Sequence, residues 1–197
     1  MAVPSRVVAP PHPRNYGGEY FSTLWTKTDA RLTRACEECW IGDSRSIAFQ
    51  GTIDGVVDVF VVDERGELRR LTQSLGLAGP RHWLQSDGHR IACLMKDERD
   101  IVQLWTVSLE GELRQLTRCE QGIGSAFTWQ GRKFAAVADG CVASIDADSG
   151  AVVALSPPSR DDDEIRPEAC VFSPDGSEIA YVRRRSGSNH ICVISAG

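Results

Sequence analysis

The chain has 197 residues, of which 42% are hydrophobic and 25% are charged, and it carries a net charge of −5. This is the composition of a soluble globular protein with a real core, and the negative charge argues against nucleic acid as a partner. No window approaches the ~18 unbroken apolar residues of a membrane span, so we expect no membrane partner.

The N-terminal residues 1–18 predict an extended arm. They contain four prolines and no apolar run like a signal-peptide core (Pro4, Pro10, Pro11 and Pro13). The seven cysteines are scattered, and four of them sit in apolar, strand-like segments (Cys93, Cys141, Cys170 and Cys192). Such thiols behave as small hydrophobes and fit a reducing compartment, so we expect mostly reduced cysteines and a cytoplasmic protein.

A short sequence repeats along the chain. Residues 66–72 read GELRRLT and residues 111–117 read GELRQLT, an offset of 45 residues, and residues 150–156 form a weaker copy, GAVVALS. Identity at six of seven positions in the first two copies is not expected by chance. The chain is therefore built from repeated units.

Each unit predicts four short antiparallel strands, which we call A to D. Strand A ends in a tight turn such as Asp87-Gly88 or Asp175-Gly176, strands B and C alternate in apolarity, and D ends in Leu-Thr. A unit of ~40–45 residues with four strands is a β-propeller blade. We predict an all-β array of about four blades at 39–73, 82–118, 126–157 and 169–197, an incomplete propeller whose last blade lacks strand D.

Two further segments precede the first blade. Residues 19–28 predict a strand from an incomplete earlier blade, and residues 29–38 predict a short helix or a loop. A β-sandwich also has frequent turns, but the 45-residue repeat argues against it.

The Ser173-Pro174-Asp175-Gly176 turn with the later Leu-Thr resembles the repeat of TolB-like propellers. Four more specific segments resemble the C-terminal half of the uncharacterised bacterial YidR-like proteins: His12-Pro13-Arg14, Pro80 to Trp83, Ile101 to Trp105, and Ser125-Ala126-Phe127 with Trp129. Members of that family are longer, so the resemblance implies that the other half is absent here. It implies a fold and no activity.

In a propeller the A strands are innermost, so residues that begin successive A strands should converge near the axis on one face. The candidate ligand-binding residues are therefore Arg81, His82, Ser125, Arg166 and Glu168. His82 is the best single candidate, although a histidine there can also simply pack against Trp83. We expect His82, Ser125 and Glu168 on the same face.

Metal and charge motifs are sparse. Cys36 and Cys39 have the spacing of a zinc half-site without a second half, and we expect no metal there and no cofactor. The acidic run 161–164 predicts a solvated loop, although clustered carboxylates can also hold a cation. The arginine run 183–185 predicts a solvated hairpin tip, although it can also contact an acidic partner.

Two functions remain open. The favoured one is a non-enzymatic propeller that binds a protein or a small ligand at the channel face, since no catalytic motif is present. The alternative is a metal-dependent carbohydrate lyase, because oligogalacturonide lyases are similar propellers that hold a metal through histidines. We also expect the array not to close alone, but to be completed by a missing half, a second copy or another chain.

Overall fold

The computed structural model describes residues 32–42, 45–73 and 84–197 of the protein. These residues form strands, turns and loops and no helix. In chain order the strands are β1 (Leu32–Trp40), β2 (Ser46–Ile53), β3 (Val56–Asp63), β4 (Leu68–Arg70), β5 (Gln85–Ser86), β6 (Arg90–Lys96), β7 (Val102–Ser108), β8 (Leu113–Gln115), β9 (Ile123–Gln130), β10 (Lys133–Ala138), β11 (Cys141–Asp146), β12 (Val152–Ala154), β13 (Asp163–Phe172), β14 (Glu178–Arg185) and β15 (Ser188–Ser195). In the described part of the chain, no helix is long and apolar enough to span a membrane.

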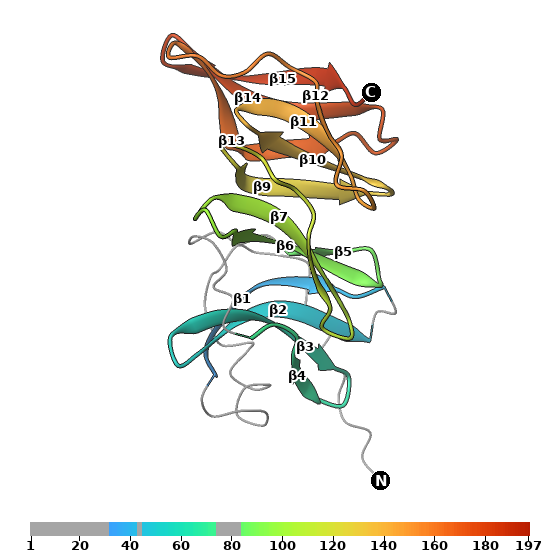
Figure 1. Ribbon diagram of the computed structural model, residues 1–197. Coiled ribbons are helices and arrows are strands. Elements are labelled where there is room, and N and C mark those ends of the chain that lie inside the picture. Colours follow the sequence, from blue (N-terminus) through green and yellow to red (C-terminus); the bar gives the residue numbers. More distant parts are fainter. Residues whose placement is uncertain (1–31, 43–44, 74–83) are drawn as a thin grey trace.

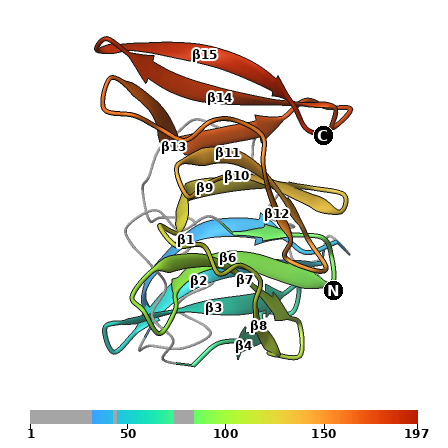
Figure 2. The same ribbon diagram turned by 45° about the horizontal axis from the view of Figure 1, so that its top comes forward.

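The strands form four antiparallel sheets in simple chain order. Blade 1 is β1-β2-β3-β4, blade 2 is β5-β6-β7-β8, blade 3 is β9-β10-β11-β12, and blade 4 is the three-stranded sheet β13-β14-β15. Figures 1 and 2 show the four sheets following one another from the blue end of the chain to the red end. The predicted all-β array of propeller blades is confirmed.

One predicted element is wrong. The helix or loop expected for residues 29–38 is, from Leu32 onwards, part of strand β1. The pairing of β1 with β2 shifts register between Leu32 and Arg34 and again between Cys36 and Cys39. Such bulges break the alternation of side chains, so the strand shows no period of two in the sequence. Residues 29–31, the arm 1–18 and the expected strand 19–28 lie outside the described residues.

The repeated Leu-Thr or Leu-Ser has a structural role at the outer edge of blades 1 to 3. The Thr72 hydroxyl accepts a hydrogen bond from the Val59 N–H at 2.9 Å, and the Thr117 hydroxyl accepts one from the Leu104 N–H at 2.9 Å. The hydroxyl of Ser156 does the same for its own blade. The hydroxyl thus continues the hydrogen bonding of the third strand beyond the point where the fourth strand ends. This bond holds strand D in place, which explains why the Leu-Thr pair is repeated.

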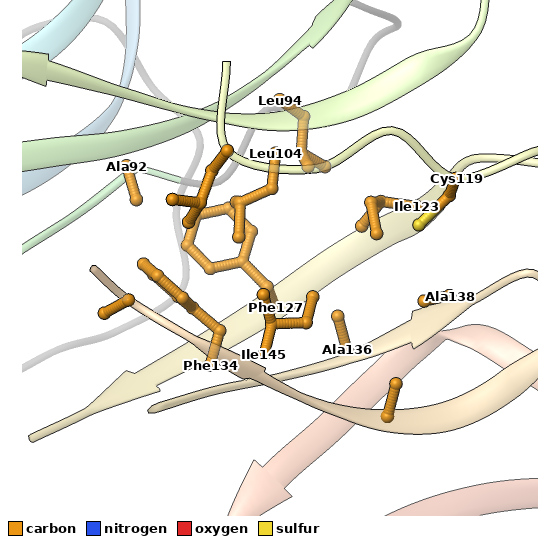
Figure 3. Packing of buried hydrophobic residues seen from close by; sticks show 13 residues of the cluster. Ala92, Leu94, Leu104, Cys119, Ile123, Phe127, Phe134, Ala136, Ala138 and Ile145 are labelled. Atoms are coloured by element: carbon orange, nitrogen blue, oxygen red, sulfur yellow. The ribbon is translucent and has the colours of Figure 1, made fainter. Parts of the chain in front are cut away.

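Three of the four apolar clusters among the described residues lie between blades. The largest buries Leu94 and Leu104 of blade 2 against Phe127 and Phe134 of blade 3. Figure 3 shows these side chains pointing into the same space between the two sheets. A second core joins blades 1 and 2, and a third joins blades 3 and 4. Each blade is therefore stabilised mainly by its neighbours in the chain.

Candidate functional site

The first strands of successive blades lie side by side and are bonded through side chains. Gln85 of β5 donates to the Phe127 carbonyl at 3.2 Å and accepts from the Trp129 N–H, both in β9. Thr128 of β9 donates to the Cys170 carbonyl in β13. These bonds hold β9 in a fixed position against β5 on one side and β13 on the other.

The closest approach of two inner strands occurs at Gly124. A Cβ at this position would lie 2.8 Å from the Pro167 Cβ and 2.9 Å from the Pro167 carbonyl oxygen. Only a residue without a side chain fits there. The contact brings the start of β9, with half-buried Ser125, beside the segment of β13 that carries Arg166 and Glu168.

Arg166 stands between two carboxylates of the same strand. Its guanidinium nitrogens lie 2.9 Å from Glu168 and 3.3 Å from Glu164. The charge of Glu168, followed by the hydrogen bond and charge of Glu164, raises the pKa of Arg166 above its usual range. All three side chains remain partly exposed. We call Glu164, Arg166 and Glu168 the inner-strand ion cluster.

The structure places the predicted site residues as follows. Ser125 lies in β9, and Arg166 and Glu168 lie in β13, next to the Gly124–Pro167 contact. Arg81 and His82 lie outside the described residues. It stays a prediction that these two residues bind a ligand. It also stays a prediction that His82 lies on the same face as Ser125 and Glu168. Sequence reasoning missed Glu164 as a member, although the alternation Glu-x-Arg-x-Glu on one strand could have shown it.

The acidic run and the arginine run meet each other. Asp161 and Asp162 lie in an exposed turn, as expected, but residues 163–164 already belong to strand β13. Residues 183–185 end strand β14 and do not form the hairpin tip expected from the sequence. Asp163 pairs in register with Arg185 and forms ion pairs with both Arg183 and Arg185. Hydrogen bonds from these two arginines lower the pKa of Asp163 to about 2. The acidic partner of the arginine run is therefore in the same chain.

Asp163→Asn is expected to weaken the acid dependence of stability. The folded pKa of Asp163 is lowered to about 2, below ~3.9 for a free aspartate. Its ion pairs therefore stabilise the fold above the unfolded value and are lost as the pH falls through the folded value. Melting temperatures measured at about pH 7, 4 and 2 should fall less steeply at the acid end for this variant than for wild type. Asp161→Asn, which changes an exposed carboxylate nearby, should keep the wild-type slope; equal slopes in all three proteins would contradict the assignment.

The cysteines whose side chains the structure describes are free thiols. Burial, with a smaller contribution from Glu38, raises the pKa of Cys39 to about 12. Burial also raises the pKa of Cys93 and Cys170 to about 12. The side chain of Cys36 is not described. Across residues 32–42, 45–73 and 84–197, no group of three or more His, Cys, Asp or Glu side chains could hold a metal ion.

The chain is similar to one curated protein over most of its length. The uncharacterized protein YidR of Escherichia coli K12 is 34% identical over an alignment 226 positions long, gaps included, which covers 87% of this chain and 52% of YidR. The chain therefore spans about half the length of that relative. No protein-family model matches the chain.

Solved propeller structures share its fold. TolB from Acinetobacter baumannii superposes with a TM-score of 0.61 at 20% identity, over 84% of this chain and 41% of TolB. Oligogalacturonate lyase in complex with manganese has a TM-score of 0.54 at 16% identity, over 84% of this chain and 51% of the lyase. At these identities the likeness shows the fold alone. The resemblance read from the sequence is confirmed at the level of the fold: the chain is an array of β-propeller blades whose fold is similar to that of TolB, and its sequence is similar to YidR over about half of that protein's length.

Proposed function

We propose that the chain is a non-enzymatic binding scaffold, and that its ligand, a protein segment or a small molecule, binds at the starting ends of the inner strands β9 and β13. The observation that supports this most is the partly exposed inner-strand ion cluster beside the Gly124–Pro167 contact. The charged groups of β13 are held in place by their own ion pairs, and β13 is packed against β9, before any ligand arrives, which reduces the entropy lost on binding.

The charges of the cluster favour one kind of ligand. One guanidinium between two carboxylates leaves a net charge of −1, and carboxylate oxygens accept several hydrogen bonds each. A ligand that presents an ammonium or guanidinium group would be attracted to Glu164 and Glu168. Arg166 would fix the orientation of both carboxylates and could itself donate to a ligand carbonyl. A basic side chain in an extended segment of a partner protein meets these requirements.

The alternative function is a metal-dependent carbohydrate lyase. It draws on the fold shared with the manganese complex of oligogalacturonate lyase. Such chemistry needs several metal ligands in one place, and the described residues supply no such group. Arg81 and His82 lie outside those residues, so this alternative rests on fold likeness and on a single histidine.

Glu168→Gln is expected to weaken ligand binding about tenfold, because it removes one of the two carboxylates that would face a basic group. The probes are an array of short extended peptides, each with one Lys or Arg, followed by titration of the tightest binder. Glu178→Gln changes an exposed carboxylate elsewhere in the same blade and should bind as wild type does.

The same preparation should be incubated with oligogalacturonate and Mn²⁺. Depolymerisation that is abolished by His82→Ala would overturn the scaffold proposal in favour of the lyase. Peptide binding that is equal in wild type and both glutamine variants would show that the inner-strand ion cluster is not the site.

A further inference from the structure

Blade 4 exposes an apolar sheet face. Val171 of β13 is 55% exposed, and Ile191 and Val193 of β15 are 83% and 57% exposed. In the pairing register Val171, Ala180 and Val193 form one row across the sheet, and Val182 and Ile191 belong to the next row. All five side chains therefore share one face. We call this set of five residues the blade 4 face.

The equivalent positions in the earlier blades are covered. The row of Val171, Ala180 and Val193 corresponds to Gln85, Ala92 and Thr106 in blade 2, and to Thr128, Ala135 and Ser144 in blade 3. Ile191 corresponds to Leu104 and to Val142, which are both fully buried. In each case the cover is the following blade, since Leu104 packs in one core with Phe127, and Val142 packs in another with Ile179.

The free edge of β15 is equivalent to the edges of β7 and β11, which are hydrogen-bonded to the fourth-strand segments of blades 2 and 3. The Leu104 N–H donates to the Thr117 hydroxyl, and the Leu104 carbonyl accepts from the Leu116 N–H at 2.9 Å. The carbonyl of Val142 accepts from the Leu155 N–H at 2.8 Å in the same way. By the register, the N–H and carbonyl of Ile191 point to the free side of β15, where a fourth strand ending in Leu-Thr or Leu-Ser would bind.

We propose that the blade 4 face and the edge of β15 are an interface for a further propeller blade and its Leu-Thr-type strand, supplied by the part of a YidR-like protein that this chain does not span. Three observations converge on this occupant. Each equivalent face in the chain is covered by a blade, each equivalent edge is filled by a Leu-Thr or Leu-Ser strand, and the chain covers 52% of YidR.

A second copy packed head to tail fits less well. It would have to offer the opposite side of blade 1, where Phe49, Phe60 and Val62 gather. These side chains are already buried in the chain as it stands, at 4%, 1% and 6% exposure. The apolar surface that would match the blade 4 face is therefore not available there.

The test is co-expression of the chain with the part of Escherichia coli YidR that it does not match, with a separate tag on each. Wild type should form a 1:1 complex by light scattering. Ile191→Lys should weaken it at least about tenfold, because a charge would enter a desolvated interface. Val153→Lys is the matched control, since Val153 is also an exposed strand valine at 57%; it should leave the complex unchanged.

Amide hydrogen exchange gives a second readout that does not depend on a variant. In the chain alone the Ile191 amide should exchange fast while the Leu104 and Val142 amides are protected, and in the complex Ile191 should become protected as well. Three results would overturn the proposal: no complex, a dimer of this chain alone that Ile191→Lys dissociates, or full protection of Ile191 in a monomer. The second points to a second copy, and the third to the chain's own N-terminal segment.

Discussion

Phe134→Ala should lower the free energy of unfolding by about 3–5 kcal/mol. Phe134 is fully buried in the core between blades 2 and 3. Its ring meets Phe127 edge-on at a centroid distance of 5.7 Å and Trp129 at 4.6 Å. Alanine would remove these contacts and leave a cavity bounded by two rigid sheets, which cannot collapse to fill it. Against a typical total stability of about 5–15 kcal/mol, the variant would approach unfolding at room temperature.

Urea denaturation followed by tryptophan fluorescence would measure the change. Trp40→Ala is the control, because it removes an even larger ring that is 63% exposed, and it should cost about 0.5 kcal/mol or less. A Phe134→Ala variant as stable as Trp40→Ala would mean that the two blades do not pack as described.

Gly150→Ala should destabilise the chain by about 2–4 kcal/mol. Gly150 adopts φ +77°, and a Cβ there would lie 1.9 Å from the carbonyl oxygen of Leu116 in the preceding blade. The variant would therefore have to separate two blades in addition to holding a left-handed backbone.

A comparison with Gly66 separates the steric cost of the added Cβ from the cost of the left-handed backbone. It is the equivalent glycine of the first repeat and adopts φ +81°, but a Cβ at Gly66 would meet nothing within 4 Å. Gly66→Ala should thus cost roughly 1 kcal/mol from the backbone alone. Thermal unfolding of both variants gives the difference, and equal melting temperatures would show that Gly150 does not fit against Leu116.

The sequence was sufficient for the fold where its signals are local. The Gly-Glu-Leu repeat predicts both the turn and the edge strand, and its Thr72 and Thr117 prove to be hydrogen-bonded within their own blades. Prediction from the sequence failed at β1, where two bulges remove the alternation of apolar and polar residues on which strand prediction depends. It also misplaced the run 183–185, because three arginines look like a solvated tip until the register places Asp163 opposite Arg185.

The candidate site was harder to predict because its geometry depends on contacts between blades. Ser125, Arg166 and Glu168 were selected by their positions at the start of A strands. The contact that brings their segments together, Gly124 against Pro167, joins positions 43 residues apart. Nothing local in the sequence marks such a pair. His82, the best single candidate from the sequence, and its neighbour Arg81 lie outside the described residues.

The hydroxyls of Thr72, Thr117 and Ser156 each hydrogen-bond the third strand of their own blade, while the apolar cores join only adjacent blades. Energetically the chain therefore behaves as a linear array with nearest-neighbour coupling. Such an array loses its order from the ends inward, and its cooperativity falls as units are removed. It also offers a simple route for change in evolution: a unit that brings its own fastening can be duplicated or deleted whole, and the remaining units need only accept a new neighbour.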